Sequence, residues 1–189
     1  MYTPIDKLSL PLFVPADRPE RFLKAIKARP DAVFIDLEDA VSPDNKAAAR
    51  DRLVAILTEL SSAVPLVVRI NAIGTLWHED DLNIVAQLPL AAVVLPKSES
   101  AADIKNVAEC SKHPVIALIE SAKGLESVRA IAKASARLAF GSIDYAADLA
   151  MSHTRLSLLT ARCEIVLASR LAGLPAPLDG VTTGALPAR

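Results

Sequence analysis

Apolar runs of strand length alternate with amphipathic segments of helix length along almost the whole chain. The apolar runs are Leu10–Val14, Ala32–Leu37, Pro65–Ile70, Ala91–Leu95, Val115–Ile119 and Leu138–Phe140, with a weaker seventh at Leu178–Val181. The helical patterns between them include Pro19–Lys27, Asn45–Leu60, Ala101–Ser111 and Arg155–Leu171. Runs that are apolar on both faces are typical of parallel strands covered by helices on each side. The alternation therefore predicts an α/β fold.

The spacing of the runs favours a barrel over a doubly wound sheet. Successive runs begin about 25 residues apart, near the size of one βα unit. The residues after the first run, Val14-Pro15-Ala16-Asp17-Arg18, contain no Gly-rich phosphate-binding pattern, which argues against a dinucleotide-binding sheet. Six or seven units in one row instead favour a TIM-type (β/α) barrel, in a single domain covering residues 1–189. Because a closed barrel has eight strands, we expect a barrel short of the eighth strand.

Composition and charge exclude several classes of protein. With 52% hydrophobic and 23% charged residues the chain is globular rather than disordered. Its formal net charge of -1 gives no electrostatic case for binding nucleic acid or an anionic membrane surface. No apolar run is long enough to span a bilayer and no secretion signal opens the chain, so we expect a cytoplasmic location. Cys110 and Cys163 match no metal or redox spacing, and we expect both to be buried thiols.

Polar and ionisable residues stand at the ends of five successive apolar runs. In a parallel barrel these positions share the C-terminal face, where active sites of such barrels are built. The candidate site residues are Glu38 and Asp39 after the second run, Arg69 and Asn71 at the third, Lys97 after the fourth, Glu120 after the fifth and Asp144 after the sixth.

Glu120 and Asp144 are the strongest candidates for a metal site. They end neighbouring strands, so their carboxylates can approach a common point, and hard oxygen ligands suit Mg²⁺. The three histidines fall in loops or at helix starts, where they build no transition-metal site. The alternative is that both carboxylates cap the following helices or pair with Lys123 and Lys97.

Two basic residues at strand ends have more than one reading. The planar guanidinium of Arg69 suits a carboxylate or thioester oxygen, and it also suits an ion pair with Glu38 or Asp39. These two roles are compatible, because an acid behind the arginine would orient it. Lys97 fits a Schiff-base lysine or an ordinary salt bridge.

Three further polar residues are open between binding and structural roles. Arg18, at the start of the first predicted helix, could meet a substrate phosphate or carboxylate, or simply lie in a solvated helix start. Asp36 and Asp148 are expected to serve packing or capping.

These motifs together resemble the citrate lyase β-subunit-like branch of the HpcH/HpaI aldolase/citrate lyase family. The resemblance runs from about Leu10 to Val181, with the motifs in the same order and at similar spacing. It is carried by Leu12-Phe13-Val14-Pro15-Ala16-Asp17-Arg18-Pro19-Glu20-Arg21, Asp36-Leu37-Glu38-Asp39-Ala40-Val41, Arg69-Ile70-Asn71, Leu95-Pro96-Lys97-Ser98-Glu99, Ile119-Glu120-Ser121-Ala122-Lys123-Gly124 and Phe140-Gly141-Ser142-Ile143-Asp144-Tyr145-Ala146-Ala147-Asp148-Leu149.

The resemblance implies a Mg²⁺-dependent carbon–carbon lyase that cleaves a citryl-, citramalyl- or malyl-CoA type of thioester to acetyl-CoA and a keto acid. Glu120 and Asp144 would be the metal ligands, and Arg69 would hold the substrate's carboxylate or the developing enolate. Glu38 and Asp39 would lie among the acids around the site, and Arg18 would help to hold the CoA-type or acyl-carrier portion of the substrate. We further predict that Glu38 and Asp39 serve catalysis beside Arg69, and that Lys97 and Asn71 bind substrate.

Two rival functions stay open at this point. One is a pyruvate-releasing class II aldolase acting on a hydroxy-keto acid without CoA. The other is a non-catalytic barrel subunit, because family members usually continue past the seventh run with another helix and an eighth strand. An incomplete barrel leaves apolar edges that need cover, so we also expect a homo-oligomer, a trimer or a hexamer.

Overall fold

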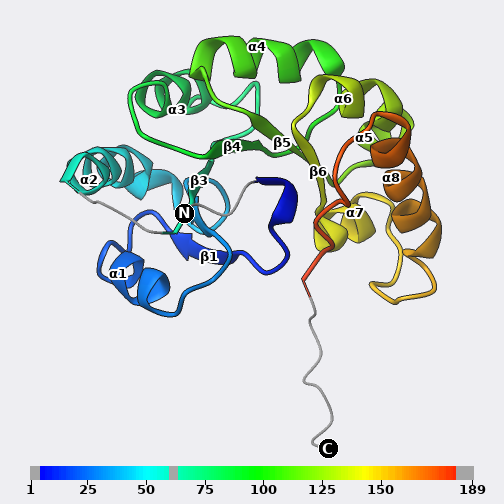
Figure 1. The fold of residues 1–189 in the computed structure, drawn as a ribbon, viewed down its shortest axis with the longest axis horizontal. Helices are drawn as coiled ribbons and strands as arrows, with labels where there is room; N and C mark the ends of the chain where they lie inside the picture. Colours follow the sequence, from blue (N-terminus) through cyan, green and yellow to red (C-terminus); the bar gives the residue numbers. More distant parts are fainter. Residues whose placement is uncertain (1–4, 60–63, 182–189) are drawn as a thin grey trace, which may run out of the picture.

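The computed structural model describes residues 5–59 and 64–181 of the chain. Six strands alternate with helices along these residues (Figure 1). The strands are β1 (Leu12–Pro15), β2 (Val33–Asp36), β3 (Leu66–Arg69), β4 (Ala92–Leu95), β5 (Val115–Ile119) and β6 (Arg137–Phe140). The helices are η1 (Ile5–Lys7), α1 (Glu20–Lys27), η2 (Pro43–Asn45), α2 (Lys46–Glu59), α3 (His78–Val85), α4 (Ala101–Ser111), α5 (Ala122–Glu126), α6 (Val128–Ala134), α7 (Ser142–Asp148) and α8 (Leu159–Leu171).

All six strands pair in parallel, and each pairs with the next strand along the chain, in the order β1-β2-β3-β4-β5-β6. A doubly wound sheet would reverse this order at a switch point, whereas consecutive order is the arrangement of a (β/α) barrel. The predicted α/β class and TIM-type arrangement are therefore confirmed. Figure 1 shows the helices arranged around the outside of the curved sheet, with η1 on its concave side.

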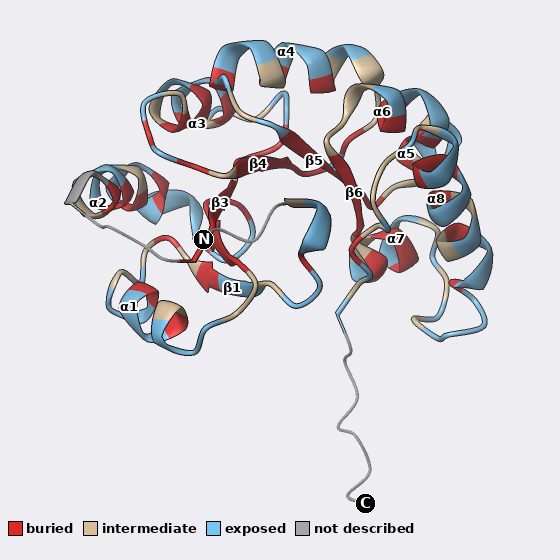
Figure 2. Cartoon of the chain, viewed as in Figure 1, coloured by how far each residue is buried: buried red, intermediate tan, exposed pale blue. Residues whose placement is uncertain are grey.

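The two faces of the sheet carry two separate apolar cores. Val33, Ile35 and Val68 point outward and pack with the helices, while Phe34 and Val67 point inward and pack with Leu178 and with residues of the N-terminal segment. Figure 2 shows β2 to β6 largely buried, β1 partly exposed and the outer faces of the helices exposed. Strands covered on both sides need apolar residues at every position, which explains why the sequence runs were continuous rather than alternating.

Two predicted elements differ from the structure. The seventh run, Leu178–Val181, forms a single parallel bridge between Leu178 and Ala139 instead of a strand. The last helix begins at Leu159 rather than Arg155, because the Thr154 hydroxyl accepts a hydrogen bond from the Ser157 N–H and holds a turn there. Its C-terminal end agrees with prediction. Gly173 has a φ of 73° directly after the helix, a conformation that glycine adopts without strain.

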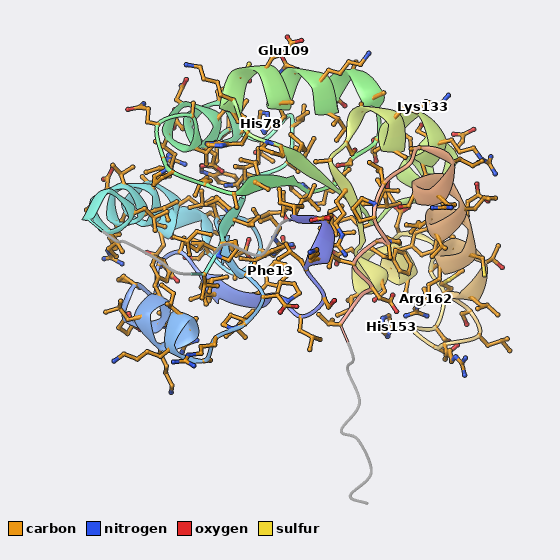
Figure 3. All side chains as sticks on the ribbon, in the orientation of Figure 1. Phe13, His78, Glu109, Lys133, His153 and Arg162 are labelled. Atoms are coloured by element: carbon orange, nitrogen blue, oxygen red, sulfur yellow. The ribbon has the colours of Figure 1, made fainter. Side chains whose placement is uncertain are left out.

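The prediction for the cysteines was wrong. Both Cys110, on α4, and Cys163, on α8, are exposed thiols. The apolar neighbours that suggested burial at Cys163 include Val166 and Leu167, which are themselves exposed on the outer face of α8. Charged side chains such as Glu109 of α4 also point outward from this helical layer (Figure 3). None of the described helices combines the length and apolar character that crossing a bilayer requires.

Candidate active site at the carboxyl ends of the strands

A cavity of about 400 Å³ opens on the concave side of the sheet. Most of its polar lining comes from the carboxyl ends of the strands and from the loops that follow them. Its apolar lining combines inward-facing strand residues with residues of the segment before β1, the start of α7 and Leu178–Val181. Phe13 of β1 is part of the apolar lining and lies near the middle of the view in Figure 3. The predicted site residues that line the cavity are Asp39, Arg69, Glu120 and Asp144.

Arg69, the last residue of β3, is held by a carboxylate of the neighbouring strand. Its Nε and Nη2 donate to Asp36 Oδ1 and Oδ2 at 2.7 and 2.6 Å, a bidentate pair in which Asp36 is only 2% exposed. Asp36 also accepts the backbone N–H groups of Glu38 and Ala40, so its carboxylate is fixed in turn. Burial disfavours the charged guanidinium, but Asp36, Glu38 and Asp39 outweigh this effect and raise the pKa of Arg69.

Glu38 and Asp39 approach the guanidinium nitrogen that Asp36 does not use. Arg69 Nη1 lies 3.1 Å from Glu38 Oε2 and 3.6 Å from Asp39 Oδ2. The ion-pair reading of Arg69 is therefore confirmed, with Asp36 as an additional partner. The Glu38 carboxylate is buried, and its Oε2 accepts no hydrogen bond from the described residues. Burial raises the pKa of Glu38 to about 7, although the charge of Arg69 opposes this rise.

Glu120 follows β5 and is 3% exposed. Its Oε1 accepts the backbone N–H of Lys97 at 2.7 Å. Burial raises the pKa of the Glu120 carboxyl to about 8; the Lys97 N–H opposes the rise, and the charges of Glu38 and Asp144 add to it. A buried acid surrounded by other acids is a site that a cation would stabilise.

Asp144 lies in the first turn of α7, directly after β6. The start of this helix is tied to the following loop, because Ser142 Oγ lies 2.9 Å from His153 Nε2. Ser142 is buried and lines the same cavity as Asp144. Figure 3 places His153 on the α7–α8 side of the molecule. Asp148 was expected to serve packing or capping, and the structure shows capping, since its Oδ2 accepts the N–H of Ala122, the first residue of α5, at 2.7 Å.

Lys97 reaches the site mainly through its backbone. Its side chain is 56% exposed, lies 3.8 Å from Glu38 Oε1 and is absent from the residues that line the cavity. Of the two readings, the salt bridge is the one that the structure contains. Arg18 is exposed in the loop before α1, and it also lies outside the cavity lining.

Asn71 belongs to a buried polar network behind the site. Its side-chain amide donates to Leu37 O at 3.0 Å and to Asp81 Oδ2 at 2.6 Å, and its backbone carbonyl oxygen lies 2.8 Å from His78 Nδ1. Both amide hydrogens are therefore used within the protein, and Asn71 does not line the cavity. Lys46 joins the same region by donating to Leu37 O and Glu38 O, both at 2.8 Å. This network joins the loop after β2, which carries Glu38, to the segment directly after Arg69 and to α3.

The residues present fit a hard divalent cation in their chemistry. Glu120 and Asp144 offer only oxygen ligands, and Glu38 Oε2, although 3.1 Å from Arg69 Nη1, accepts no hydrogen bond from the part of the chain that the structure describes. Within residues 5–59 and 64–181, no three His, Cys, Asp or Glu side chains converge as a preformed metal cluster. Mg²⁺ commonly binds through one or two carboxylates and completes its shell with water and substrate oxygens, so two protein ligands suffice.

Two contributors to the site went beyond the sequence-based prediction. Asp36 was assigned to packing or capping, yet it is also the clamp for Arg69. The signal was available, because Asp36 and Arg69 both end strands, and residues at the same register of neighbouring parallel strands face the same side. Gly141 makes room for Glu120, as a Cβ at this position would lie 2.4 Å from Glu120 Oε2. No local sequence pattern predicts this contact between Gly141, which follows β6, and Glu120, which follows β5.

Comparison with known proteins places the whole arrangement in a family. Residues 10–186 match the family HpcH/HpaI aldolase/citrate lyase. The chain is 37% identical over 186 residues to a citrate lyase subunit beta-like protein of Deinococcus radiodurans, covering 91% of this chain and 65% of that protein. It is 36% identical over 161 residues to the L-malyl-CoA/beta-methylmalyl-CoA lyase of Cereibacter sphaeroides, covering 76% of this chain and 51% of that protein. The chain thus spans between half and two thirds of these relatives' lengths.

Solved structures agree with this placement. The structure of protein CitE from Mycobacterium tuberculosis in complex with magnesium, acetoacetate and coenzyme A matches with a TM-score of 0.81 at 36% identity, over 95% of this chain and 68% of that one. RipC from Yersinia pestis matches with a TM-score of 0.80 at 31% identity, over 95% of this chain and 78% of that one. The chain belongs to the HpcH/HpaI aldolase/citrate lyase family, in its citrate lyase β-subunit-like branch.

Proposed function

We propose that this protein is a Mg²⁺-dependent carbon–carbon lyase that cleaves a 3-hydroxyacyl thioester, of the citramalyl-, malyl- or citryl-CoA type, to acetyl-CoA and a keto acid. One observation carries the proposal: Glu120, Asp144 and Arg69 come from three different strand ends and line one cavity. Two acids and a fixed arginine are the groups required to bind a cation and an anionic substrate together.

Glu120 and Asp144 would hold the Mg²⁺. The bound ion would supply positive charge that polarises the substrate's oxygens and makes its hydroxyl group more acidic. The protein's own contribution is to keep the two carboxylates at one end of a largely apolar cavity, where charge interactions are stronger than in water. The high pKa of Glu120 reflects the same surroundings, because an uncompensated carboxylate is disfavoured there.

Arg69 would bind the substrate's carboxylate or the negative charge that develops on it. In the proposed reaction the hydroxyl loses its proton, the carbon–carbon bond breaks to give the keto product, and the electron pair passes to the thioester as an enolate that is then protonated. A guanidinium already held by Asp36 stabilises such charge without having to reorganise. Glu38 and Asp39 would act through Arg69, by keeping Nη1 in place.

The thioester part of the proposal is supported by the relatives. One is named a malyl-CoA/beta-methylmalyl-CoA lyase, and a structural neighbour was crystallised with magnesium, acetoacetate and coenzyme A. The exposed cations Arg18 and Lys97 are the candidates for holding the anionic part of such a substrate outside the cavity. The amide of Asn71 would contribute through the loops that it ties together, since both its hydrogens are used internally.

Product analysis tests the proposal. The purified protein should be incubated with Mg²⁺ and citramalyl-CoA, malyl-CoA or citryl-CoA, and with a 4-hydroxy-2-keto acid without CoA, and the products separated chromatographically. Acetyl-CoA and a keto acid from a CoA ester support the lyase. Pyruvate released only from the substrate without CoA would replace it with the aldolase. Folded protein that cleaves neither kind of substrate would favour the non-catalytic subunit.

A homo-oligomer, a trimer or hexamer, remains a prediction of this proposal, as does a cytoplasmic location. The exposed apolar side chains of Leu10, Leu12 and Phe13 at the β1 edge support the oligomer, since such an edge tends to be covered. Light scattering coupled to size-exclusion chromatography measures the assembly directly, and a monomer at micromolar concentration would contradict it.

A further inference from the structure

The carboxylate of Glu120, a proposed metal ligand, is fixed in position from two sides. The two residues that fix it would not themselves bind the metal. On one side the backbone N–H of Lys97 donates to Oε1 at 2.7 Å. On the other side the backbone of Gly141 passes so close to Oε2 that even a methyl group would not fit between them. Lys97 follows β4 and Gly141 follows β6, so the strands on both sides of β5 supply these two contacts.

Lys97 has a backbone conformation that its residue type rarely adopts. Its φ is 45°, in the left-handed region that favours glycine. The side chain does not explain this conformation, because it is 56% exposed and makes only a 3.8 Å ion-pair contact with Glu38. The hydrogen bond from the Lys97 N–H to the buried Glu120 carboxylate is the interaction that the unusual backbone makes, and strained backbone at a functional site is commonly kept for such a purpose.

Gly141 contributes by lacking a side chain. A Cβ placed on its backbone would lie 2.4 Å from Glu120 Oε2 and 2.6 Å from Glu120 Cβ. Its φ of -82° is one that other residues adopt freely, so the requirement for glycine here is one of space and not of backbone freedom. A larger residue at 141 would therefore push Glu120 away without straining its own backbone.

We propose that Lys97 and Gly141 form a cradle that presets the Glu120 carboxylate for the metal, Lys97 through its backbone N–H and Gly141 through its missing side chain. The proposal rests on the proposed function, in which Glu120 is a metal ligand. Both are positioning residues rather than catalytic ones. Lys97 acts through its backbone. We therefore expect a residue that favours the left-handed conformation to preserve Mg²⁺ binding when it is substituted for Lys97.

Substitutions at Lys97 separate its backbone from its side chain. Lys97→Gly and Lys97→Val both remove the ion pair with Glu38, but only valine disfavours the left-handed backbone. Mg²⁺ binding measured by calorimetry should stay within about fivefold of wild type for Lys97→Gly, because an exposed ion pair contributes little. Lys97→Val should bind Mg²⁺ about 10- to 100-fold more weakly, the usual effect of losing a partner that orients a metal ligand.

Lys112 provides the matched control. It is another exposed lysine with a left-handed backbone, φ 60°. It caps the C-terminus of α4, near the amino end of β5, whereas Glu120 follows the carboxyl end of that strand. Lys112→Gly and Lys112→Val should therefore bind Mg²⁺ like the wild type, even if valine lowers the stability in both places. Equal weakening by Lys97→Val and Lys112→Val would show a general effect of stability and overturn the proposal.

Two further readouts cover the case in which Lys97→Val does not fold. Gly141→Ala should weaken Mg²⁺ binding to a similar extent, while circular dichroism reports whether its fold is kept. In the metal-free wild type, the Lys97 amide should exchange slowly with solvent, and rapid exchange would overturn the proposal without any variant. Wild-type protein that binds no Mg²⁺ would refute the metal site itself, whereas wild-type binding left unchanged in folded variants would refute only the cradle.

Discussion

Replacing Asp36 by asparagine tests the clamp on Arg69. The carboxylate is 2% exposed and accepts four hydrogen bonds, two from the guanidinium and two from backbone N–H groups. The substitution keeps the size of the side chain but removes its charge, and it turns one acceptor into a donor that must face another donor. Arg69, with 13% of its side chain exposed, would lose its closest counter-charge.

The expected cost follows from this burial. Breaking a buried ion pair by removing one partner typically costs about 3–5 kcal/mol. Glu38 and Asp39 remain within 3.1 and 3.6 Å of Nη1, and they offset part of the loss. We therefore expect Asp36→Asn to lower the free energy of unfolding by about 3 kcal/mol. For a urea dependence of about 2 kcal/mol per molar, the unfolding midpoint would fall by about 1.5 M.

The assay is urea unfolding at pH 7, followed by circular dichroism, with Asp80→Asn as the control. Asp80 also pairs with an arginine, Arg50 at 3.0 Å, but its side chain is 62% exposed. Losing such an exposed pair should cost less than about 1 kcal/mol. If Asp36→Asn were no more damaging than Asp80→Asn, the clamp would not be the interaction that fixes Arg69.

Three further predictions concern the charged residues of the site. Glu120→Gln and Asp144→Asn should each abolish turnover while circular dichroism shows an unchanged fold, and a variant that kept wild-type Mg²⁺ dependence would refute the ligand assignment. Arg69→Lys should lower kcat/KM by at least about 100-fold, because a point charge cannot replace the bidentate fork, and near-normal kinetics would remove Arg69 from the mechanism. The pKa of Glu38 rises from 4.5 to about 7 on folding, so the folded state binds more protons across this window, and the stability of the metal-free protein should fall as pH rises through it. Urea midpoints at successive pH values should show this fall. Glu38→Gln should make the fall smaller without abolishing it, because the pKa of Glu120 is raised as well, to about 8. An identical pH profile for the variant would contradict the assignment.

Much of the fold could be predicted because parallel strands buried on both faces leave continuous apolar runs. Ala32–Leu37, for example, contains β2 with one residue to spare at each end. The seventh run, Leu178–Val181, is weaker, because it is short and contains Gly180, and it forms one bridge instead of a strand. The start of α8 was missed because the side chains of Thr154 and Ser157 hold a turn that helix periodicity does not reveal.

The site was predictable to the level of which residues stand at the strand ends. Glu120, Asp144 and Arg69 do line one cavity, as their places after neighbouring runs indicated. Which hydrogen-bond or ion-pair partner each side chain would take could not be predicted from the sequence. The left-handed backbone of Lys97 carries no signal, since the residue is not glycine. The side-chain amide of Asn71 is not available to the cavity because Leu37 O and the Asp81 carboxylate, the latter on α3, accept its two hydrogens.

The most direct test of the account is Mg²⁺-dependent release of acetyl-CoA by the purified protein, compared between wild type and Glu120→Gln. Citramalyl-CoA and malyl-CoA are the substrates, with EDTA as the control. We expect release that needs Mg²⁺, stops in EDTA and is absent from the folded variant. Release that continues in EDTA, or that the variant retains at the wild-type rate, would contradict the claim that a metal held by Glu120 drives the reaction.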